Sequence, residues 1–297
     1  IAAGLSLYAE KSIYGNGVWT WFSDPRAVYH NGATYIGSIT AGGSPMISKY
    51  VHATGVSTQF ILHSFLEVDD HDNPSIYIMP DGRIVCFYSK HSVVGNGPLY
   101  RISTNPEDIS AWGSEVVMTG ITTPTCYTNP FLLSKSGKVY MFYRAGISQN
   151  GPTPSAWSYK TTTNFSSWSA EQKVMQPATS ASTPYYKMTS NGYDRIDIVA
   201  TSQHPVQGQV SIYHVYMLLD ESNVEHWYKS DGTEIVAAKP FLPASGKLVY
   251  DGSTVRGWIW EIAYGADGHP RILGTRYPNN NGTDIRYMHW RWTGTAW

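Results

Sequence analysis

Charged residues, cysteines and long apolar runs are all scarce in this chain of 297 residues. Asp, Glu, Lys and Arg make up 14% of it and the net charge is −1, so nothing indicates nucleic-acid binding or attraction to an anionic membrane. The two cysteines are too few for a disulfide framework and have no metal-ligand spacing. Because no apolar run is long enough to span a bilayer, we expect no membrane insertion.

Helical periodicity is also nearly absent, and turn signals followed by alternating strands recur in its place. Asn31-Gly32 precedes a strand pattern at 33–37, and Asp81-Gly82 precedes one at 83–88. The launch points at 32, 81, 137 and 193 are 49, 56 and 56 residues apart, and the next, at 268, follows after 75. This period is typical of four-stranded propeller blades, and the longer gap has room for extra strands such as Val210 to Leu219.

The sequence therefore predicts an all-β fold, a single β-propeller domain over residues 1–297 with four-stranded antiparallel blades. The spacing favours five blades and is compatible with up to seven. Cys86 lies within an alternating strand, where we expect a buried free thiol.

Aromatic residues are abundant, with 22 Tyr and 11 Trp against 8 Phe. Tyr and Trp combine a flat apolar face with a polar group, which suits a groove that binds carbohydrate. Strands of any β-protein also favour aromatic residues, so composition alone leaves both interpretations open.

The segment around His71 is the strongest candidate for chemistry. The acidic run Asp69-Asp70-His71-Asp72-Asn73-Pro74 precedes one predicted strand, and His91 follows the next. Histidine is the side chain most easily tuned for proton transfer near neutral pH. The run could also supply metal ligands, but alternate residues of an extended segment point to opposite faces, and the spacing of a calcium loop is absent. We therefore predict that the acidic residues form a turn, with no cofactor, and leave a structural metal ion open.

The next blade carries candidates at equivalent positions. The matched pairs are His71 with Tyr127, Asn73 with Asn129, and His91 with Arg144. Because blades repeat radially, these pairs should meet at one end of the central channel. A third blade adds Tyr185, Lys187 and His204.

Further motifs keep the order of one known family. They are Trp19-Thr20-Trp21-Phe22-Ser23-Asp24-Pro25-Arg26, Phe142-Tyr143-Arg144, Ser202-Gln203-His204-Pro205, Tyr213-His214-Val215-Tyr216 and Arg286-Tyr287-Met288-His289-Trp290. With the acidic run, they resemble the BNR-repeat family that contains the ulvan-type polysaccharide lyases. The resemblance covers nearly the whole chain. The lyases of that family are longer and seven-bladed, and their structural metal ligands have no equivalents that we can place here.

The resemblance implies a uronate-binding cleft in which a glycosidic bond is broken by β-elimination. His71 and Tyr127 match the family's catalytic acid–base pair, and Arg144 matches the arginine that neutralises the substrate carboxylate. Which of His71 and Tyr127 is the base depends on the configuration of the substrate at C5 and stays open. For substrate binding we predict His91, Asn73, Asn129, Tyr185, Lys187 and His204.

Two other functions are compatible with the sequence. A sialidase-like glycoside hydrolase would need a carboxylate pair, for which Asp24, Asp69 and Asp70 are candidates. A non-catalytic carbohydrate-binding propeller, or the receptor-binding or tailspike module of a phage, would explain the aromatic content without proton transfer. The favoured prediction is a secreted or extracellular lyase whose partner is an anionic, ulvan-like polysaccharide. No leader is visible at Ile1, as expected if one has been removed.

Overall fold

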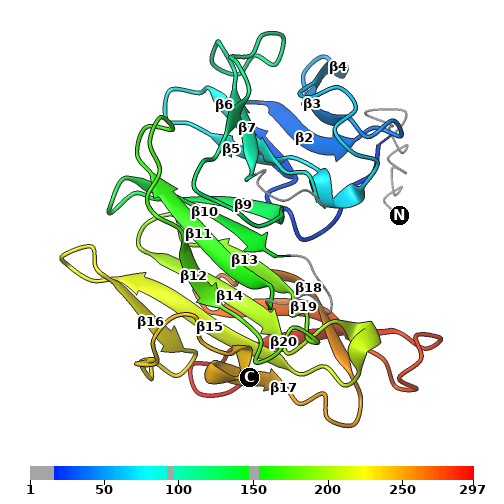
Figure 1. Cartoon of the computed structure of the whole chain (residues 1–297), viewed down its shortest axis with the longest axis vertical. Helices are drawn as coiled ribbons and strands as arrows, with labels where there is room; N and C mark the ends of the chain where they lie inside the picture. The colour runs from blue at the N-terminus through cyan, green and yellow to red at the C-terminus, as the bar shows by residue number, and fades with distance from the viewer. Residues whose placement is uncertain (1–16, 92–96, 147–153) are drawn as a thin grey trace, which may run out of the picture.

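The computed structural model describes residues 17–91, 97–146 and 154–297, so residues 1–16 of the predicted domain lie outside the described part. Five antiparallel sheets follow one another along the chain as the blades of a β-propeller, from the blue first blade to the orange and red fifth in Figure 1. The all-β, five-bladed prediction is confirmed. Helix is limited to short 3₁₀ turns, and none of the described helices has the length and apolar character of a membrane span.

Each blade is a meander in which strands that follow one another in the chain also pair. Blade one contains β1 (Ala27–His30), β2 (Ala33–Ile39), β3 (Pro45–Val51) and β4 (Val56–Ile61). Blade two contains β5 (Ser75–Ile78), β6 (Ile84–Tyr88), β7 (Leu99–Ile102) and β8 (Val116–Val117), preceded by the 3₁₀ turn η1 (Asp70–Asp72). Blade three contains β9 (Thr125–Leu133), β10 (Lys138–Ala145), β11 (Ala156–Thr162) and β12 (Gln172–Met175).

The last two blades depart from the predicted four strands. Blade four contains β13 (Tyr186–Ser190), β14 (Arg195–Thr201), β15 (Ile212–Leu219) and β16 (Glu225–Lys229), and β17 (Lys247–Tyr250) also pairs with β15. The turns η2 (Pro205–Gln207) and η3 (Pro243–Ser245) lie within this stretch. Blade five has three strands among the described residues: β18 (Gly257–Tyr264), β19 (Pro270–Arg276) and β20 (Arg286–Arg291). The long gap in the turn spacing therefore holds one additional described strand, β17, whereas the stretch predicted as an extra strand, Val210 to Leu219, contains β15, the third strand of blade four.

The turn signals at 32, 81, 137, 193 and 268 each join the first and second strands of a blade. At the first of them, Asn31 and Gly32 both have positive φ, 45° and 78°, between the paired residues His30 and Ala33. Two positive φ values are what a tight two-residue hairpin requires, which explains the Asn-Gly pair.

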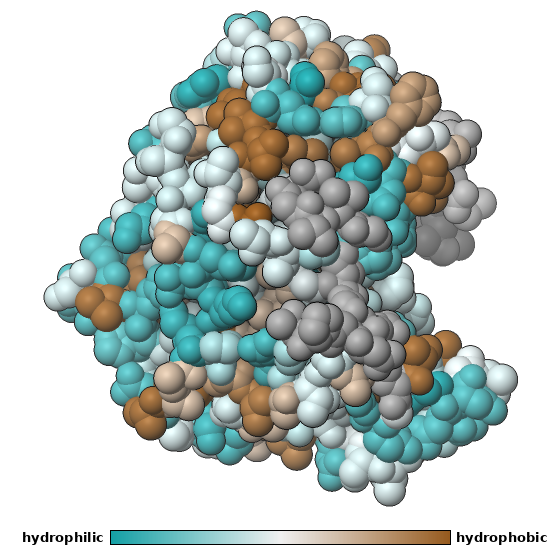
Figure 2. Space-filling model, in the orientation of Figure 1, coloured by the Kyte–Doolittle hydropathy of each residue, from teal (hydrophilic) through white to brown (hydrophobic). Residues whose placement is uncertain are grey.

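Period-two alternation divides the side chains of the second strands between the two neighbouring blades. In β6, Ile84, Cys86 and Tyr88 join the core shared with blade one, while Val85 and Phe87 join the core shared with blade three. Both faces of the strand are thereby buried, and Cys86 is a buried free thiol as predicted. On the face shown in Figure 2, hydrophobic residues form separate patches between hydrophilic ones.

A segment before the first blade, residues 18–26, is held by the first strands of several blades. The side-chain oxygen of Asn73 accepts from Thr20 N at 3.0 Å. Asn129 accepts from Asp24 N at 3.2 Å and donates to the carbonyl oxygen of Phe22 at 3.0 Å. Both amides are buried, so these hydrogen bonds satisfy polar groups that water cannot reach.

Blades four and five hold the same segment by charge and by ring stacking. The ammonium of Lys187 in β13 donates to the carbonyl oxygen of Trp21 and pairs with Asp24. Trp21 stacks on Trp260 of β18, with ring centroids 4.7 Å apart and planes inclined by 22°. The segment thus connects blades that are far apart in the sequence.

We expect Asn129→Ala to lower the free energy of unfolding by about 2 to 3 kcal/mol, because it leaves buried backbone groups of the segment unpaired. Urea unfolding followed by tryptophan fluorescence measures this. Asn105→Ala is the control, since Asn105 is exposed and makes only one long side-chain contact, to Asp108. Equal stability of the two variants would contradict the anchoring role.

Candidate active site

The structure brings His71, His91, Tyr127 and Arg144 together, as the blade register predicts. The ring of His71 stacks on that of His91, with centroids 4.0 Å apart and planes inclined by 11°. It also stacks on the ring of Tyr127 at 4.9 Å. The guanidinium carbon of Arg144 lies 4.6 Å from the centroid of the Tyr127 ring. Their roles in a reaction stay predictions.

A β-bulge directs Tyr127 to this place. The pairing of β9 with β10 shifts between Phe142, opposite Asn129, and Arg144, opposite Cys126. Tyr127 falls within the shift and has a φ of 59°, a region that non-glycine residues seldom occupy. Bulges re-aim side chains and are frequent beside active sites, and such strain persists only where the surroundings enforce it.

Asp69 connects the two histidines. Its carboxylate oxygens lie 2.5 Å from His71 Nδ1 and 2.7 Å from His91 Nδ1. It also accepts from the backbone N–H of His71 at 2.9 Å, as the N-cap of η1. Burial alone would raise the pKa of Asp69, but the hydrogen bonds from both imidazoles outweigh it and hold that pKa well below its ordinary range.

Because an ionised carboxylate can only accept, Nδ1 of each imidazole must carry a proton. In the neutral form of His71 the lone pair is then on Nε2, where it is available as a base. Burial would lower the pKa of His71, but hydrogen bonds to Asp69 and Asp70 outweigh it and raise that pKa. Asp69 thus fixes the tautomer of His71 in the way that the aspartate of a Ser-His-Asp triad fixes the tautomer of its histidine.

The remaining acidic residues of the run differ in environment. The side chain of Asp70 is 47% exposed, against 24% for Asp69. Asp72 is fully buried, and burial with the nearby charges of Glu67 and Asp69 raises its pKa to about 9. The interpretation of the acidic run as a turn is therefore correct for η1 but incomplete, because Asp69 also orients both imidazoles. The Asp-x-His spacing was the available signal.

Arg144 is a buried cation in this cluster. The residue is 2% exposed, and its Nε and Nη1 atoms have no hydrogen-bond partner among the described residues. Tyr127 is equally buried, and burial raises its pKa well above the ordinary value although Arg144 opposes the shift. Tyr127 is therefore a neutral phenol at neutral pH. A buried guanidinium whose donors have no partner is suited to bind an anion, because the anion accepts those hydrogen bonds and compensates the positive charge.

Tyr185 and His204 extend the cluster towards blade five. The guanidinium carbon of Arg144 lies 5.1 Å from the ring centroid of Tyr185, and the rings of Tyr185 and His204 are 5.3 Å apart. Burial and the charge of Arg144 lower the pKa of His204. Both residues are thus placed for contact with a ligand at Arg144.

Asn73, Asn129 and Lys187 are not part of the cluster. The two amides bond the backbone of residues 20–24, and the ammonium of Lys187 is fully buried against Trp21 and Asp24. These contacts are with the segment 18–26, so they are structural. We leave these three out of the substrate-binding set proposed below.

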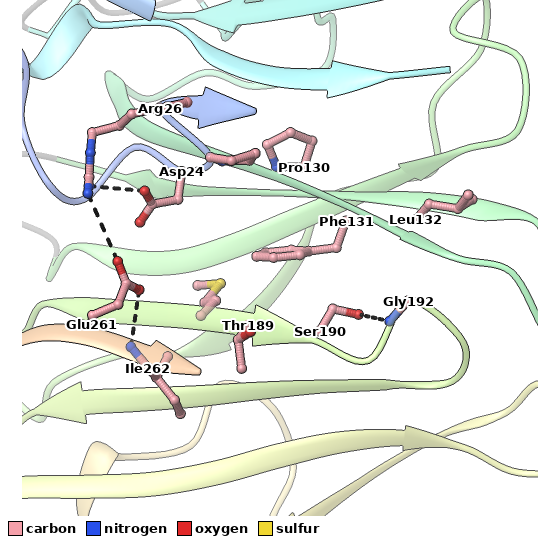
Figure 3. Close-up of a pocket in the computed structure, with 13 residues that line it drawn as sticks. Asp24, Arg26, Pro130, Phe131, Leu132, Thr189, Ser190, Gly192, Glu261 and Ile262 are labelled. Atoms are coloured by element: carbon pink, nitrogen blue, oxygen red, sulfur yellow. Dashed lines mark hydrogen bonds and ion pairs between the residues drawn. The ribbon is translucent and has the colours of Figure 1, made fainter. Parts of the chain in front are cut away.

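A cavity lies farther along the first strands, away from the cluster, and is shown in Figure 3. It measures about 510 Å³ and is lined by residues such as Pro130 and Thr189, but by no member of the cluster. Asp24 pairs with Arg26 at 3.0 Å, and Glu261 approaches Arg26 at 4.0 Å and Lys187 at 3.4 Å. Asp24 is thus ion-paired with Arg26 and Lys187 and lines this cavity, whereas Asp69 pairs with the two imidazoles of the cluster.

One group among the described residues has the composition of a metal site. It consists of Asp69, His71 and His91, whose ligand atoms lie within 4.8 Å of one another. The separations between the Asp69 oxygens and the two Nδ1 atoms are those of charge-assisted hydrogen bonds, so we interpret the group as a carboxylate shared by two imidazoles.

Comparisons with known proteins agree with this fold. The model of a family described as "BNR repeat-containing family member" matches residues 33–297. An ulvan lyase of Nonlabens ulvanivorans is 22% identical over 98% of this chain and 68% of its own length. The Ulvan Lyase-PL25 of Pseudoalteromonas sp. (strain PLSV) is 24% identical over 92% of this chain and 62% of its own. The chain thus spans about two thirds of the length of these relatives.

Among solved structures, a PL25 ulvan lyase bound to -[GlcA(1-4)Rha3S]- superposes with a TM-score of 0.75 at 18% identity. The match covers 95% of this chain and 71% of that one. At this identity the likeness shows the fold.

We expect Asp69→Asn to lower the pKa of His71, because the amide no longer stabilises the imidazolium by its charge. An NMR titration of the His71 ring protons measures the shift. Asp70→Asn is the matched control and should lower the pKa less, since solvent screens the more exposed Asp70. An unchanged titration of His71 in the Asp69 variant would contradict the proposed hydrogen bond.

Proposed function

The chain belongs to the BNR repeat-containing family, and we propose that it is a polysaccharide lyase that cleaves an anionic, uronate-containing polysaccharide such as ulvan. The observation that carries this proposal is the buried guanidinium of Arg144, with two unpartnered donors, beside an imidazole whose tautomer is set by Asp69. The relatives named ulvan lyases support the same substrate class.

Arg144 would bind the carboxylate of the uronate. Removal of the proton at C5 places negative charge on that carboxylate, and a guanidinium fork stabilises the charge through two parallel hydrogen bonds. The low polarity of a buried site strengthens the interaction. The cation therefore makes the C5 proton acidic enough for a side chain to remove.

Nε2 of His71 would take the C5 proton. The electron pair of the C5–H bond forms a double bond between C4 and C5, the C4–O bond breaks, and the leaving oxygen receives a proton. Tyr127 would supply that proton, because its raised pKa keeps it protonated. Since His71 must be neutral to act as a base, the rate should rise with pH through its raised pKa.

His91, Tyr185 and His204 would complete the binding site around the uronate. His91 shares Asp69 with His71, and Tyr185 lies on the guanidinium of Arg144. We further propose that the protein acts outside the cell, where such polymers occur.

Incubation with ulvan tests the function, because β-elimination forms an unsaturated uronate that absorbs ultraviolet light. New reducing ends without this absorbance would indicate a hydrolase, and binding with neither would indicate a carbohydrate-binding module.

We expect Tyr127→Phe to lower the rate roughly 10²- to 10⁴-fold, because it removes the proton donor and retains the ring.

Tyr140→Phe is the control for that substitution. Tyr140 is buried in the same blade but contacts Glu225 instead of the cluster, and its loss should leave the rate unchanged. A Tyr127→Phe variant with the wild-type rate would refute the assignment of Tyr127 as the acid.

Because Arg144 supplies the positive charge at the carboxylate, we propose that the reaction needs no metal ion or other cofactor. Protein dialysed against EDTA should cleave a desalted ulvan oligosaccharide at the untreated rate. Loss of activity that Ca²⁺ or Zn²⁺ restores would contradict this proposal and would favour a metal at Asp69, His71 and His91.

A further inference from the structure

An aromatic pocket adjoins the cluster on the side of blade five. It measures about 530 Å³, and six rings line it: Trp21, His204, Trp258, Trp260, Tyr277 and Tyr287. Pro205, Thr275 and Ile285 complete the lining, so none of the described lining residues carries a fixed charge. The pocket therefore differs in chemistry from the cluster, where Asp69 and Arg144 dominate.

Two of the rings form a fixed wall, and a third is open to solvent. Trp21 and Trp260 stack nearly in parallel, at 4.7 Å and 22°, and Trp21 is also held by Lys187 through its carbonyl oxygen. Tyr287 in β20 is 73% exposed. An exposed aromatic side chain loses little conformational entropy when a ligand covers it, because it has few rotatable bonds.

His204 connects the pocket to the cluster, because it belongs to the pocket lining and its ring contacts residues on both sides. Its ring lies 5.3 Å from that of Tyr185, which covers Arg144, and 5.7 Å from that of Trp258. A chain whose carboxylate is bound at Arg144 would therefore reach the aromatic pocket with its next sugar units.

We propose that this pocket is a binding subsite for the sugar unit adjacent to the uronate, which packs an apolar C–H face on Trp260 and Tyr287. The proposal rests on the proposed function, because it takes the uronate to be bound at Arg144. The pocket recognises the shape and the apolar face of the neighbouring sugar, whereas Arg144 recognises charge. The subsite would select a polymer in which uronates alternate with a sugar that has such a face.

Binding of defined ulvan oligosaccharides tests the subsite. Affinities are measured by titration calorimetry in the Tyr127→Phe background, because this substitution slows cleavage. The probes are the uronate–rhamnose sulfate disaccharide and the corresponding tetrasaccharide. We expect the tetrasaccharide to bind more tightly than the disaccharide. Tyr287→Ala and Trp260→Ala should each weaken the binding of both oligosaccharides about 3- to 10-fold and leave the binding of glucuronate alone unchanged, as expected for one aromatic contact to the adjacent sugar.

Tyr29→Ala is the matched control, since Tyr29 is 67% exposed in blade one and remote from the pocket lining. It should change neither affinity. Removal of the sulfate should leave the effect of Tyr287→Ala intact, because no charge in the pocket lining contributes.

The outcomes separate the two proposals. Ultraviolet absorbance with wild-type protein, together with unchanged tetrasaccharide affinity in both pocket variants, would overturn the subsite and leave the lyase function standing. Oligosaccharide binding without any absorbance would overturn the lyase function, while the pocket variants would still decide the subsite. Absence of binding at every length would overturn both.

Discussion

The buried anchoring of residues 18–26 is the constraint on which the rest of the structure depends. Each blade buries its faces against its neighbours, and the main contacts among the described strands do not join the first blade to the fifth. The segment does so, because Asn73, Asn129 and Lys187 bind it from three blades and Trp260 stacks on it from a fourth. Because these partners are buried, an error in the relative position of the blades would leave polar groups unpaired.

The same anchoring positions the candidate site. Asn73 lies two residues after His71, at the end of the turn η1, and Asn129 lies two residues after Tyr127 in β9, so each amide holds the segment that carries a residue of the cluster. The carbonyl oxygen of Tyr127 also accepts from the Asn129 amide at 2.8 Å, next to the bulge that turns the tyrosine. The polar anchors and the residues of the cluster thus lie close together in the sequence, so the contacts that fix the segment 18–26 also fix the backbone next to His71 and Tyr127.

Much of the fold follows from local rules. Turn-forming dipeptides and period-two alternation reflect backbone sterics and burial of both strand faces, and together they predict the five hairpins correctly. Radial repetition then predicts that His71, His91, Tyr127 and Arg144 converge. The functions of Asn73, Asn129 and Lys187 were not predictable in this way, because their partners lie 53 to 166 residues away. Asp69 was predicted as part of the turn or as one carboxylate of a hydrolase, and its contact with His91 was not predictable, because that contact also depends on the fold.

The sequence by itself determined the class of fold, the blade spacing and the set of side chains that meet at one end of the channel, because these depend on periodicities of two residues and of about one blade. Only the tertiary structure decided what each polar side chain does there. Asp70 is accessible to solvent, whereas Asp72 is buried. Asp69 lies between two imidazoles, and two donors of the buried Arg144 have no described partner. Desolvation and partner choice are properties of three-dimensional neighbourhoods, so a pattern along the chain cannot specify them.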